Sequence, residues 1–214
     1  MTRLEIVSDV VCPWCYLGAA NLLRALADRD RPSPFAIRWR PFRLDPTLPP
    51  EGIDRAEYLA GKFGDQAAID AAHARIVEAG REVGLAYRFD LIRRSPSSLD
   101  AHRVIRWAEA EGLQTRTAMA LFARYFERGE DISDPAVLVS AAAEAGMDGA
   151  AVARLLAGDA DREEVAAEAG EMQGLGVTGV PTFLVGGRYA VSGAQATSLW
   201  LRLAAEIDAA ADPQ

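Results

Sequence analysis

Cysteine and histidine are both scarce in this chain, and their scarcity limits its chemistry. Among 214 residues there are two cysteines, Cys12 and Cys15, and two histidines, His73 and His102. A structural zinc ion takes four ligands, and each histidine falls in a stretch with helical periodicity. We therefore expect no metal site.

The chain also lacks an excess of positive charge and any long hydrophobic run. Asp and Glu outnumber Lys and Arg by 31 to 23, which gives a formal charge of −8. Nucleic-acid backbones and anionic membranes bind clustered Lys and Arg side chains, so we expect neither as a partner. No run of about 18 apolar residues occurs, so no transmembrane helix is expected.

The N-terminus lacks the pattern of a secretory signal. It begins Met-Thr-Arg-Leu-Glu-Ile and has neither an uninterrupted apolar segment nor a small-residue cleavage site. We therefore expect the mature chain to start near Met1 and the protein to be cytoplasmic. In a compartment that keeps thiols reduced, a pair of cysteines is more often catalytic than structural.

The sequence does contain Cys12-Pro13-Trp14-Cys15, shortly after an apolar run that begins at Leu4. Two residues between cysteines at the start of a helix bring both sulfurs within bridging range. Unpaired backbone N–H groups and the helix dipole favour a thiolate there, so we expect an exposed Cys12 to attack and Cys15 to resolve the mixed disulfide. Pro13 suits the first helical position, and Trp14 is expected to control access to the thiols.

Three other interpretations of the pair stay open from the residues alone. The cysteines could be ordinary buried apolar residues, half of a zinc site, or a structural disulfide. The zinc interpretation is disfavoured by the shortage of further ligands. The spacing favours a redox pair over the other two.

The order of the expected elements predicts an α/β fold. Residues 4–8 and 35–40 have strand patterns on either side of a helix from 13 to about 28. After a proline-rich boundary at 41–52, helical periodicity dominates up to about 175. Residues 182–192 then predict a hairpin around Gly186-Gly187, and a last helix follows whose residues 209–214 are expected to fray.

Strand, helix and strand at the start, with a hairpin and helix at the end, is the order of a thioredoxin-like fold interrupted by an all-helical domain. We expect residues 1–50 and 176–214 to form the thioredoxin-like domain and residues 51–175 the helical insertion. Within the insertion, Asp54 and Asp134 are expected to cap helices. Ser97 and Asp100 resemble a capping box for a helix that Gly112 ends.

Pro181 begins the strand after Gly176-Val177-Thr178-Gly179-Val180. Proline cannot donate to a sheet ladder, and a cis Val180–Pro181 bond would expose backbone groups to an extended peptide or to glutathione. An ordinary proline at a strand start is the alternative. Together with the cysteine pair, the cis interpretation is favoured, and we expect this segment to fold against Cys12.

Several segments together resemble the FrnE-type branch of the DsbA family, over nearly the whole chain. They are residues 8–18, 100–103, 121–122 with 125–126, 129–132, 176–183 and 189–195. The resemblance implies dithiol-disulfide exchange, with Cys12 as nucleophile and Cys15 as resolving thiol. It implies substrate contacts from Pro13, Trp14 and the Val180-Pro181 loop. Thiols or disulfides of proteins or small molecules are the implied substrates, with no bound cofactor and glutathione as a candidate co-substrate.

The chain departs from the family pattern at three places. Ile6 stands where many thioredoxin-like enzymes keep a buried acid, so proton transfer at Cys15 is left to water or to Asp9. Ser97-Ser98 replaces Asn-Thr, which leaves a polar substrate contact from that position open. Trp14 replaces the His of oxidising members, so strong oxidant behaviour is not implied.

Two other functions compete with disulfide exchange. The family is related to kappa-class glutathione transferases and 2-hydroxychromene-2-carboxylate isomerases, which generally have Ser at the position of Cys12, so a glutathione-dependent isomerase or transferase is the main alternative. The other is a chaperone-like protein that holds extended peptides against exposed Trp14, Tyr16 and Phe42. One further interpretation makes His102 a base near the thiols, although nothing in the sequence places it there. A homodimer is one of the states that the sequence allows.

Overall fold

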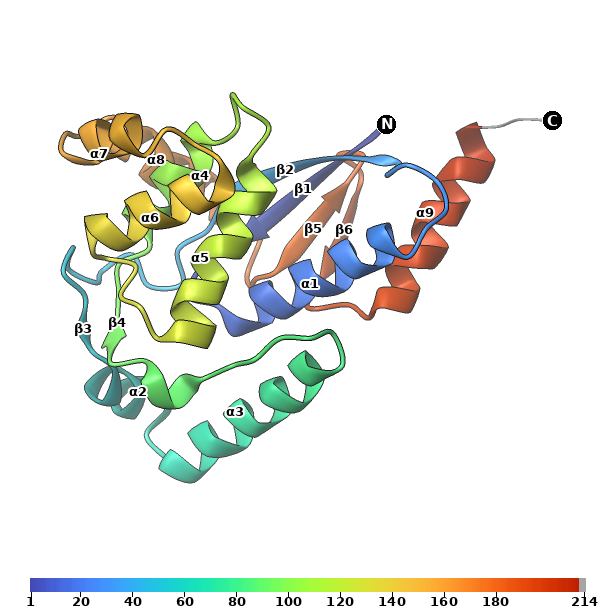
Figure 1. Cartoon of the computed structure of the whole chain (residues 1–214). Helices are drawn as coiled ribbons and strands as arrows, with labels where there is room; N and C mark the ends of the chain where they lie inside the picture. Colours follow the sequence, from blue (N-terminus) through green and yellow to red (C-terminus); the bar gives the residue numbers. More distant parts are fainter. Residues whose placement is uncertain (212–214) are drawn as a thin grey trace.

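A four-stranded sheet forms the centre of the computed structural model, which describes residues 1–211 (Figure 1). Its strands lie in the order β2 (Phe35–Pro41), β1 (Thr2–Ser8), β5 (Thr182–Val185) and β6 (Tyr189–Ser192). β1 runs parallel to β2 and antiparallel to β5, and β5 pairs antiparallel with β6. The four strands expected in this part of the chain are confirmed.

One face of the sheet is covered by α1 (Pro13–Ala27) and α9 (Thr197–Ala211), which pack side by side (Figure 1). Trp200 of α9 is fully buried, with its ring centroid 4.6 Å from that of Phe183 in β5. Fraying was expected from residue 209, but α9 continues to Ala211 because the helix is anchored on the sheet. That expectation also covered residues 212–214, which lie outside the described part of the chain.

The opposite face of the sheet is covered by α8 (Arg162–Gly174). Because side chains alternate along a strand, Leu4 and Ile6 of β1 enter the main core with α1. Val7 points the other way and packs in a smaller buried cluster with Met172 of α8. The sheet is therefore buried on both faces at the position of the cysteine pair.

Most of the chain between β2 and β5 is helical. Before α8 come α2 (Arg55–Phe63), α3 (Gln66–Arg81), α4 (Leu99–Trp107), α5 (Gln114–Arg128), α6 (Pro135–Ala145) and α7 (Gly149–Leu156). The structure adds a two-stranded sheet of β3 (Ile53–Asp54) and β4 (Arg94–Ser95), and a 3-10 turn at Phe89–Leu91. Strands of two residues are too short to show an alternating pattern, so the sequence gives no sign of them.

Two of the expected helix caps are confirmed and one is wrong. Asp54 and Asp134 each accept hydrogen bonds from backbone N–H groups in the first turn of the helix that follows. α4 begins instead after Ser98, whose side chain makes no capping bond, and it ends at Trp107, before Gly112. Asp100 is drawn away from the expected capping box because its carboxylate binds the Arg103 guanidinium at 3.0 Å.

The hairpin between β5 and β6 turns at Gly186 and Gly187, whose φ angles are +60° and +69°. Positive φ at both central residues is what a type I′ turn requires, and glycine adopts it without steric cost. The hairpin expected from the sequence is confirmed, together with the residues that turn it.

A continuous core joins the sheet to the helical block. The ring of Tyr16 in α1 stacks on Phe122 and Phe126 of α5, with centroids 5.2 and 6.2 Å away. Trp39 of β2 lies 6.1 Å from the same Phe122 ring. Buried residues connect the two parts without a break, so the core does not mark where one part ends and the other begins. The domain boundaries at 50 and 175 therefore stay a prediction.

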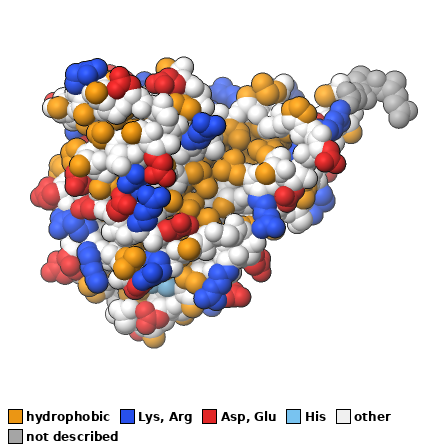
Figure 2. All heavy atoms as spheres, viewed as in Figure 1, with side chains coloured by type: hydrophobic (Ala, Val, Ile, Leu, Met, Phe, Trp, Pro, Cys, Tyr) orange, Lys and Arg blue, Asp and Glu red, His pale blue; other side chains and the backbone are white. Residues whose placement is uncertain are grey.

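The face shown in Figure 2 has acidic and basic side chains interspersed over the helical block, and hydrophobic side chains gather in a hollow near the centre of the view. Within residues 1–211, no helix combines the length and apolar composition that crossing a membrane would need.

Candidate active site

The cysteine pair lies at the N-terminus of α1. Cys12 is the N-cap residue in an extended conformation, with φ −95° and ψ 112°, and the helix begins at Pro13. The Cys12 N–H donates to the Asp9 carbonyl at 3.0 Å, and the Cys12 carbonyl accepts from the Cys15 N–H at 3.0 Å. Both cysteines are free thiols. The local geometry therefore places Cys12 at the positive end of the helix dipole, as the spacing predicts.

Cys12 differs from expectation in its exposure. The sequence predicts an exposed attacking thiol, but Cys12 is only 5% exposed and Cys15 1%. The reason is the loop before β5, since the Cys12 thiol donates to the Val180 carbonyl at 3.5 Å. A segment 168 residues away in sequence therefore lies over the first sulfur.

The Val180–Pro181 peptide bond is cis, as the sequence predicts. The Pro181 carbonyl accepts from the Gly193 N–H at 2.8 Å, which ties the loop to the end of β6. On its other side the loop rests on α1 at Gly18, where an added Cβ atom would lie 3.1 Å from Pro181 Cγ. The absence of a side chain at Gly18 thus permits the close approach of the loop to the cysteine-bearing helix.

Cys15 is held as a neutral thiol by its surroundings. Burial raises its pKa well above the ordinary value, and the hydrogen bond and charge of Cys12 raise it further. The Ser8 hydroxyl and the Asp9 backbone act in the opposite direction, and they lower the pKa by less than burial raises it. Cys15 therefore needs a partner for its proton before it can act as a nucleophile.

The residues expected to bind substrate differ in what they present to solvent. Trp14 is 43% exposed, while the Pro13 carbonyl accepts a 2.7 Å hydrogen bond from the Tyr87 hydroxyl. Burial raises the pKa of Tyr87, so this donor keeps its proton. Trp14 is the large side chain beside the thiols that remains available for contact.

The exposed aromatic surface expected for peptide holding is wrong at two of its three positions. Tyr16 is 4% exposed and Phe42 is 5% exposed, and only Trp14 lies at the surface. Tyr16 is drawn inward by stacking on α5 and by a 2.9 Å hydrogen bond from its hydroxyl to Glu127. The geometry therefore gives the chaperone-like interpretation little support.

A buried acid and histidine lie behind the cysteine loop, and the sequence alone did not bring them together. Asp9 is fully buried, and its carboxylate accepts from the Leu44 N–H at 2.7 Å. His102 of α4 is 5% exposed, and its Nε2 lies 3.4 Å from Asp9 Oδ1 and 3.0 Å from the Phe42 carbonyl oxygen. His102 therefore does lie beside the loop that carries the thiols.

Ser8 and Ser97-Ser98 also turn out to be buried. Ser8 escaped the sequence reasoning because it ends a strand four residues before Cys12, where a serine is unremarkable. The available signal was its place inside the Ser8 to Gly18 segment that carries the family resemblance.

Among residues 1–211, no three His, Cys, Asp or Glu side chains are grouped in a way that could hold a metal ion.

The sheet order, the cis-proline loop and the dithiol at a helix N-terminus together define a thioredoxin-like protein. Residues 3–202 match the model of the DSBA-like thioredoxin domain, and the chain belongs to that family. This confirms both the fold class and the family that the sequence motifs indicate.

Solved structures with the same fold carry several related names. A probable DsbA oxidoreductase, SCO1869 from Streptomyces coelicolor, is 31% identical, with a TM-score of 0.85 over 100% of this chain and 93% of that one. The cytosolic disulfide reductase DsbM from Pseudomonas aeruginosa, in a structure with GSH, is 21% identical, with a TM-score of 0.66 over 98% and 96% of the two chains. A 2-hydroxychromene-2-carboxylate isomerase is 16% identical, with a TM-score of 0.69 over 98% and 96%. The last two likenesses concern the fold alone.

Proposed function

We propose that this protein is a thiol-disulfide oxidoreductase that exchanges disulfides with protein or small-molecule substrates through Cys12 and Cys15. The observation that carries the proposal is the pair of free thiols at the start of α1, with the Cys12 sulfur 3.5 Å from the Val180 carbonyl of the opposing loop. Membership of the DSBA-like family supports the same reaction class.

The reaction begins with Cys12. As a thiolate, it attacks one sulfur of a substrate disulfide, forms a mixed disulfide and releases the other substrate sulfur as a thiolate. Cys15, after losing its proton, attacks the Cys12 sulfur and releases the second substrate thiolate. The protein is then left with a Cys12–Cys15 disulfide and the substrate with two thiols. The reverse sequence oxidises a substrate dithiol.

Substrate binding is assigned to Pro13, Trp14, Val180 and Pro181. Trp14 offers an apolar contact beside the thiols, and the Val180-Pro181 loop offers backbone groups to an extended peptide or to glutathione. Glutathione as co-substrate is supported by the likeness to DsbM, whose structure contains GSH. DsbM is named a cytosolic protein, and we propose a cytoplasmic location here as well.

The test uses the two single cysteine variants in turnover of insulin disulfides and of glutathione disulfide. Cys12→Ser is expected to lower turnover to the level of the buffer control, because it removes the attacking sulfur. Cys15→Ser should accumulate a mixed disulfide on Cys12, visible as added mass that a reductant removes. Full turnover by Cys12→Ser would reject the proposal. A glutathione redox titration of the wild-type pair then gives the direction of exchange.

A glutathione-dependent isomerase or transferase of the kappa-like type is the competing function, and the same variants separate it from the first. Activation of glutathione by a hydrogen bond requires no second thiol, so Cys15→Ser would keep full isomerase or transferase activity. Disulfide exchange needs Cys15 to complete its cycle. The presence of both cysteines at the helix start therefore favours the oxidoreductase.

A further inference from the structure

The disulfide exchange proposed above has two steps, and the second takes place within the protein. The Cys15 sulfur must reach the Cys12 sulfur along the line of the bond that joins Cys12 to the substrate. Such an intramolecular attack is fast only when the reacting atoms are held close together and aligned. Pro13 and Trp14 separate the two cysteines, so the position of the peptide group between them affects that alignment.

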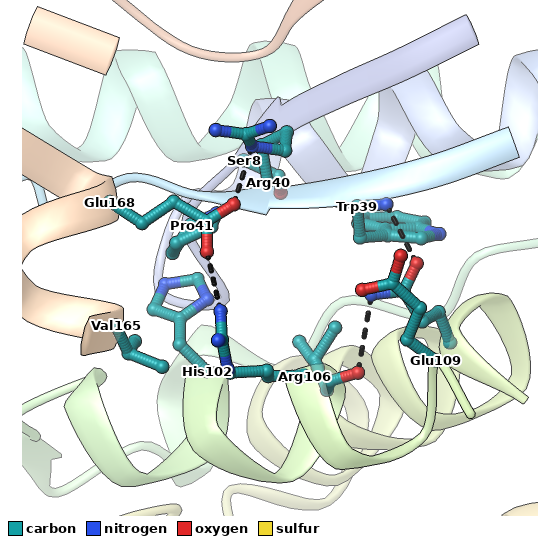
Figure 3. Close-up of a pocket in the computed structure, with 11 residues that line it drawn as sticks. Ser8, Trp39, Arg40, Pro41, His102, Arg106, Glu109, Val165 and Glu168 are labelled. Atoms are coloured by element: carbon teal, nitrogen blue, oxygen red, sulfur yellow. Dashed lines mark hydrogen bonds and ion pairs between the residues drawn. The ribbon is translucent and has the colours of Figure 1, made fainter. Parts of the chain in front are cut away.

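The chain that leads into this turn is held from the sheet. β1 ends at Ser8, whose carbonyl accepts from the Phe42 N–H at 2.9 Å. Near this strand end, Glu168 of α8 pairs with Arg40 of β2 at 2.5 Å and with Arg106 of α4 at 3.0 Å (Figure 3). Three elements therefore meet where the cysteine loop begins, and none of these contacts reaches the turn between the two sulfurs.

The turn itself is contacted from the helical block, by Tyr87. The Tyr87 hydroxyl lies 2.7 Å from the Pro13 carbonyl oxygen and donates to it, because a carbonyl can only accept. This carbonyl belongs to the peptide group that joins Pro13 to Trp14, midway between the two cysteines. A side chain 74 residues away in sequence thus binds the centre of the dithiol turn.

The Tyr87 ring has a closely fitted place in the core. It is 6% exposed, and its centroid lies 5.6 Å from that of Tyr16 and 5.4 Å from that of Phe89. Gly80 of α3 makes room for the ring, since an added Cβ atom there would lie 2.6 Å from Tyr87 Cε2. Close packing on these sides leaves the ring little freedom to move, so the hydroxyl is presented to Pro13 from a fixed position.

The segment that carries Tyr87 is tied to the cysteine-bearing helix by a second contact. Glu127 of α5 accepts two hydrogen bonds on Oε1, from the Ala86 N–H at 3.1 Å and from the Tyr16 hydroxyl at 2.9 Å. Tyr16 belongs to α1, so one carboxylate joins the first turn of α1 to the residue before Tyr87. The distance between the Tyr87 backbone and the turn is therefore set by hydrogen bonds as well as by packing.

We propose that Tyr87 is a positioning residue for disulfide exchange, and that its hydroxyl holds the Pro13–Trp14 peptide so that Cys15 is aligned with Cys12. The inference rests on the proposed function. Cys15 loses its proton to solvent, and its sulfur gives an electron pair to the Cys12 sulfur. The bond from Cys12 to the substrate sulfur breaks, and the substrate leaves as a thiolate. Tyr87 takes part in no bond change, because it acts only on the geometry of the turn.

The test separates the two chemical steps with a symmetrical aryl disulfide that releases a coloured thiolate. Attack by Cys12 releases the first thiolate at a rate that rises with disulfide concentration. Attack by Cys15 releases the second at a rate independent of that concentration. Both phases are followed by stopped-flow absorbance at neutral pH, in the wild type and in Tyr87→Phe, which removes the hydroxyl and keeps the ring.

Tyr87→Phe is expected to slow the second phase about two- to tenfold, which corresponds to the loss of one hydrogen bond that aligns the reacting sulfurs. The first phase should stay within about twofold, because attack by Cys12 on an external disulfide does not require Cys15 to be aligned. A general loss of structure would slow both phases, so the difference between them measures positioning.

Tyr125→Phe is the matched control, because it removes the same atom from a tyrosine that is 1% exposed. The Tyr125 hydroxyl donates to the Arg94 carbonyl at 3.1 Å, in β4, and accepts from Arg55. Its loss should lower stability about as much as the loss of the Tyr87 hydroxyl, and it should leave both phases at the wild-type rate. Denaturant melts of the two variants check that their stabilities are comparable.

The proposal would be overturned by a second phase of Tyr87→Phe that matches the wild type, by equal slowing of both phases, or by the same slowing in Tyr125→Phe. A wild-type protein that releases no thiolate, or only the first one, would instead reject the proposed function. The failure of the inference and the failure of the proposed function are therefore distinct.

Discussion

Two cysteines three residues apart occupy different environments, although both are buried. Cys12 lies at the helix start with its thiol on the Val180 carbonyl, whereas Cys15 lies one turn deeper with Ser8 and Asp9 as its polar neighbours. Burial raises the pKa of Cys15 first, and the neighbouring Cys12 adds to the effect. The division of roles between the two thiols thus follows from depth in the fold.

The raised pKa of Cys15 predicts how stability depends on pH. Below its unfolded-state pKa of about 8.5 the thiol is neutral in both states, so the full stability is present. Above that value the unfolded chain loses the proton while the folded protein keeps it, so the free energy of unfolding should fall as pH rises toward the folded-state pKa. Urea unfolding of the reduced protein between pH 7 and 10 measures this slope.

The matched control for that experiment is Cys15→Ala, which removes the buried thiol and leaves Cys12 in place. Its free energy of unfolding should fall less steeply over the same pH range. The interpretation fails if the variant and the wild type show equal slopes. Burial also raises the pKa of Tyr16 and Tyr87, so their phenols add a similar fall in stability near pH 10, which the variant and the wild type share.

Among the elements, α1 makes the contacts on which the site depends. Its N-terminus carries the thiols, the helix packs against α9, and its sixth residue, Gly18, approaches the loop before β5. At Gly18 an added Cβ atom would lie 3.1 Å from Pro181 Cγ, 3.3 Å from Ala194 Cα and 3.3 Å from the Phe183 ring. These three distances are shorter than ordinary van der Waals contacts, so the neighbouring atoms would have to shift by a few tenths of an ångström to admit the added methyl group.

Gly18→Ala is therefore expected to lower the free energy of unfolding by about 1 to 2 kcal/mol, since overpacking outweighs the helix preference of alanine. Gly170 of α8 is the matched control, because it is helical and an added Cβ atom would meet nothing within 4 Å. Gly170→Ala should raise stability by about 0.5 to 1 kcal/mol. Denaturant melts of both variants measure the difference, and an equal gain in both would show that the loop yields at Gly18.

The whole molecule is held together by aromatic packing between the sheet and the helical block. Phe122 of α5 is completely buried and contacts both Tyr16 of α1 and Trp39 of β2. A core that crosses the predicted domain boundaries should make the chain unfold as one unit. Far-UV circular dichroism and tryptophan fluorescence are expected to report a single transition at one denaturant concentration.

Phe122→Ala tests that view, because it opens a cavity where the two parts meet. It is expected to cost about 3 to 5 kcal/mol and to shift both probes together. Phe63→Ala provides the control, since Phe63 is 57% exposed and its removal should change stability by no more than about 0.5 kcal/mol. Two separate transitions in the Phe122 variant would mean that the sheet and the helical block unfold independently.

The local elements were predictable because their signals lie within single segments. The strands at 4–8 and 35–40 follow from apolar patterning, and α1 follows from Pro13 and the cysteine spacing. The Asp54 and Asp134 caps act on residues two or three positions away. The capping box at Ser97 failed because Asp100 found a stronger partner in Arg103.

By itself, the sequence determined the fold class, the family, the dithiol motif and the second segment expected to face it. Only the tertiary structure decided that Tyr16 and Phe42 are buried, that the Val180 carbonyl covers Cys12, and that His102 lies beside Asp9. The physical reason is distance along the chain. A helix cap or a strand pattern is set by residues nearby in the sequence, whereas the burial of a side chain depends on which remote residues the packed core brings together.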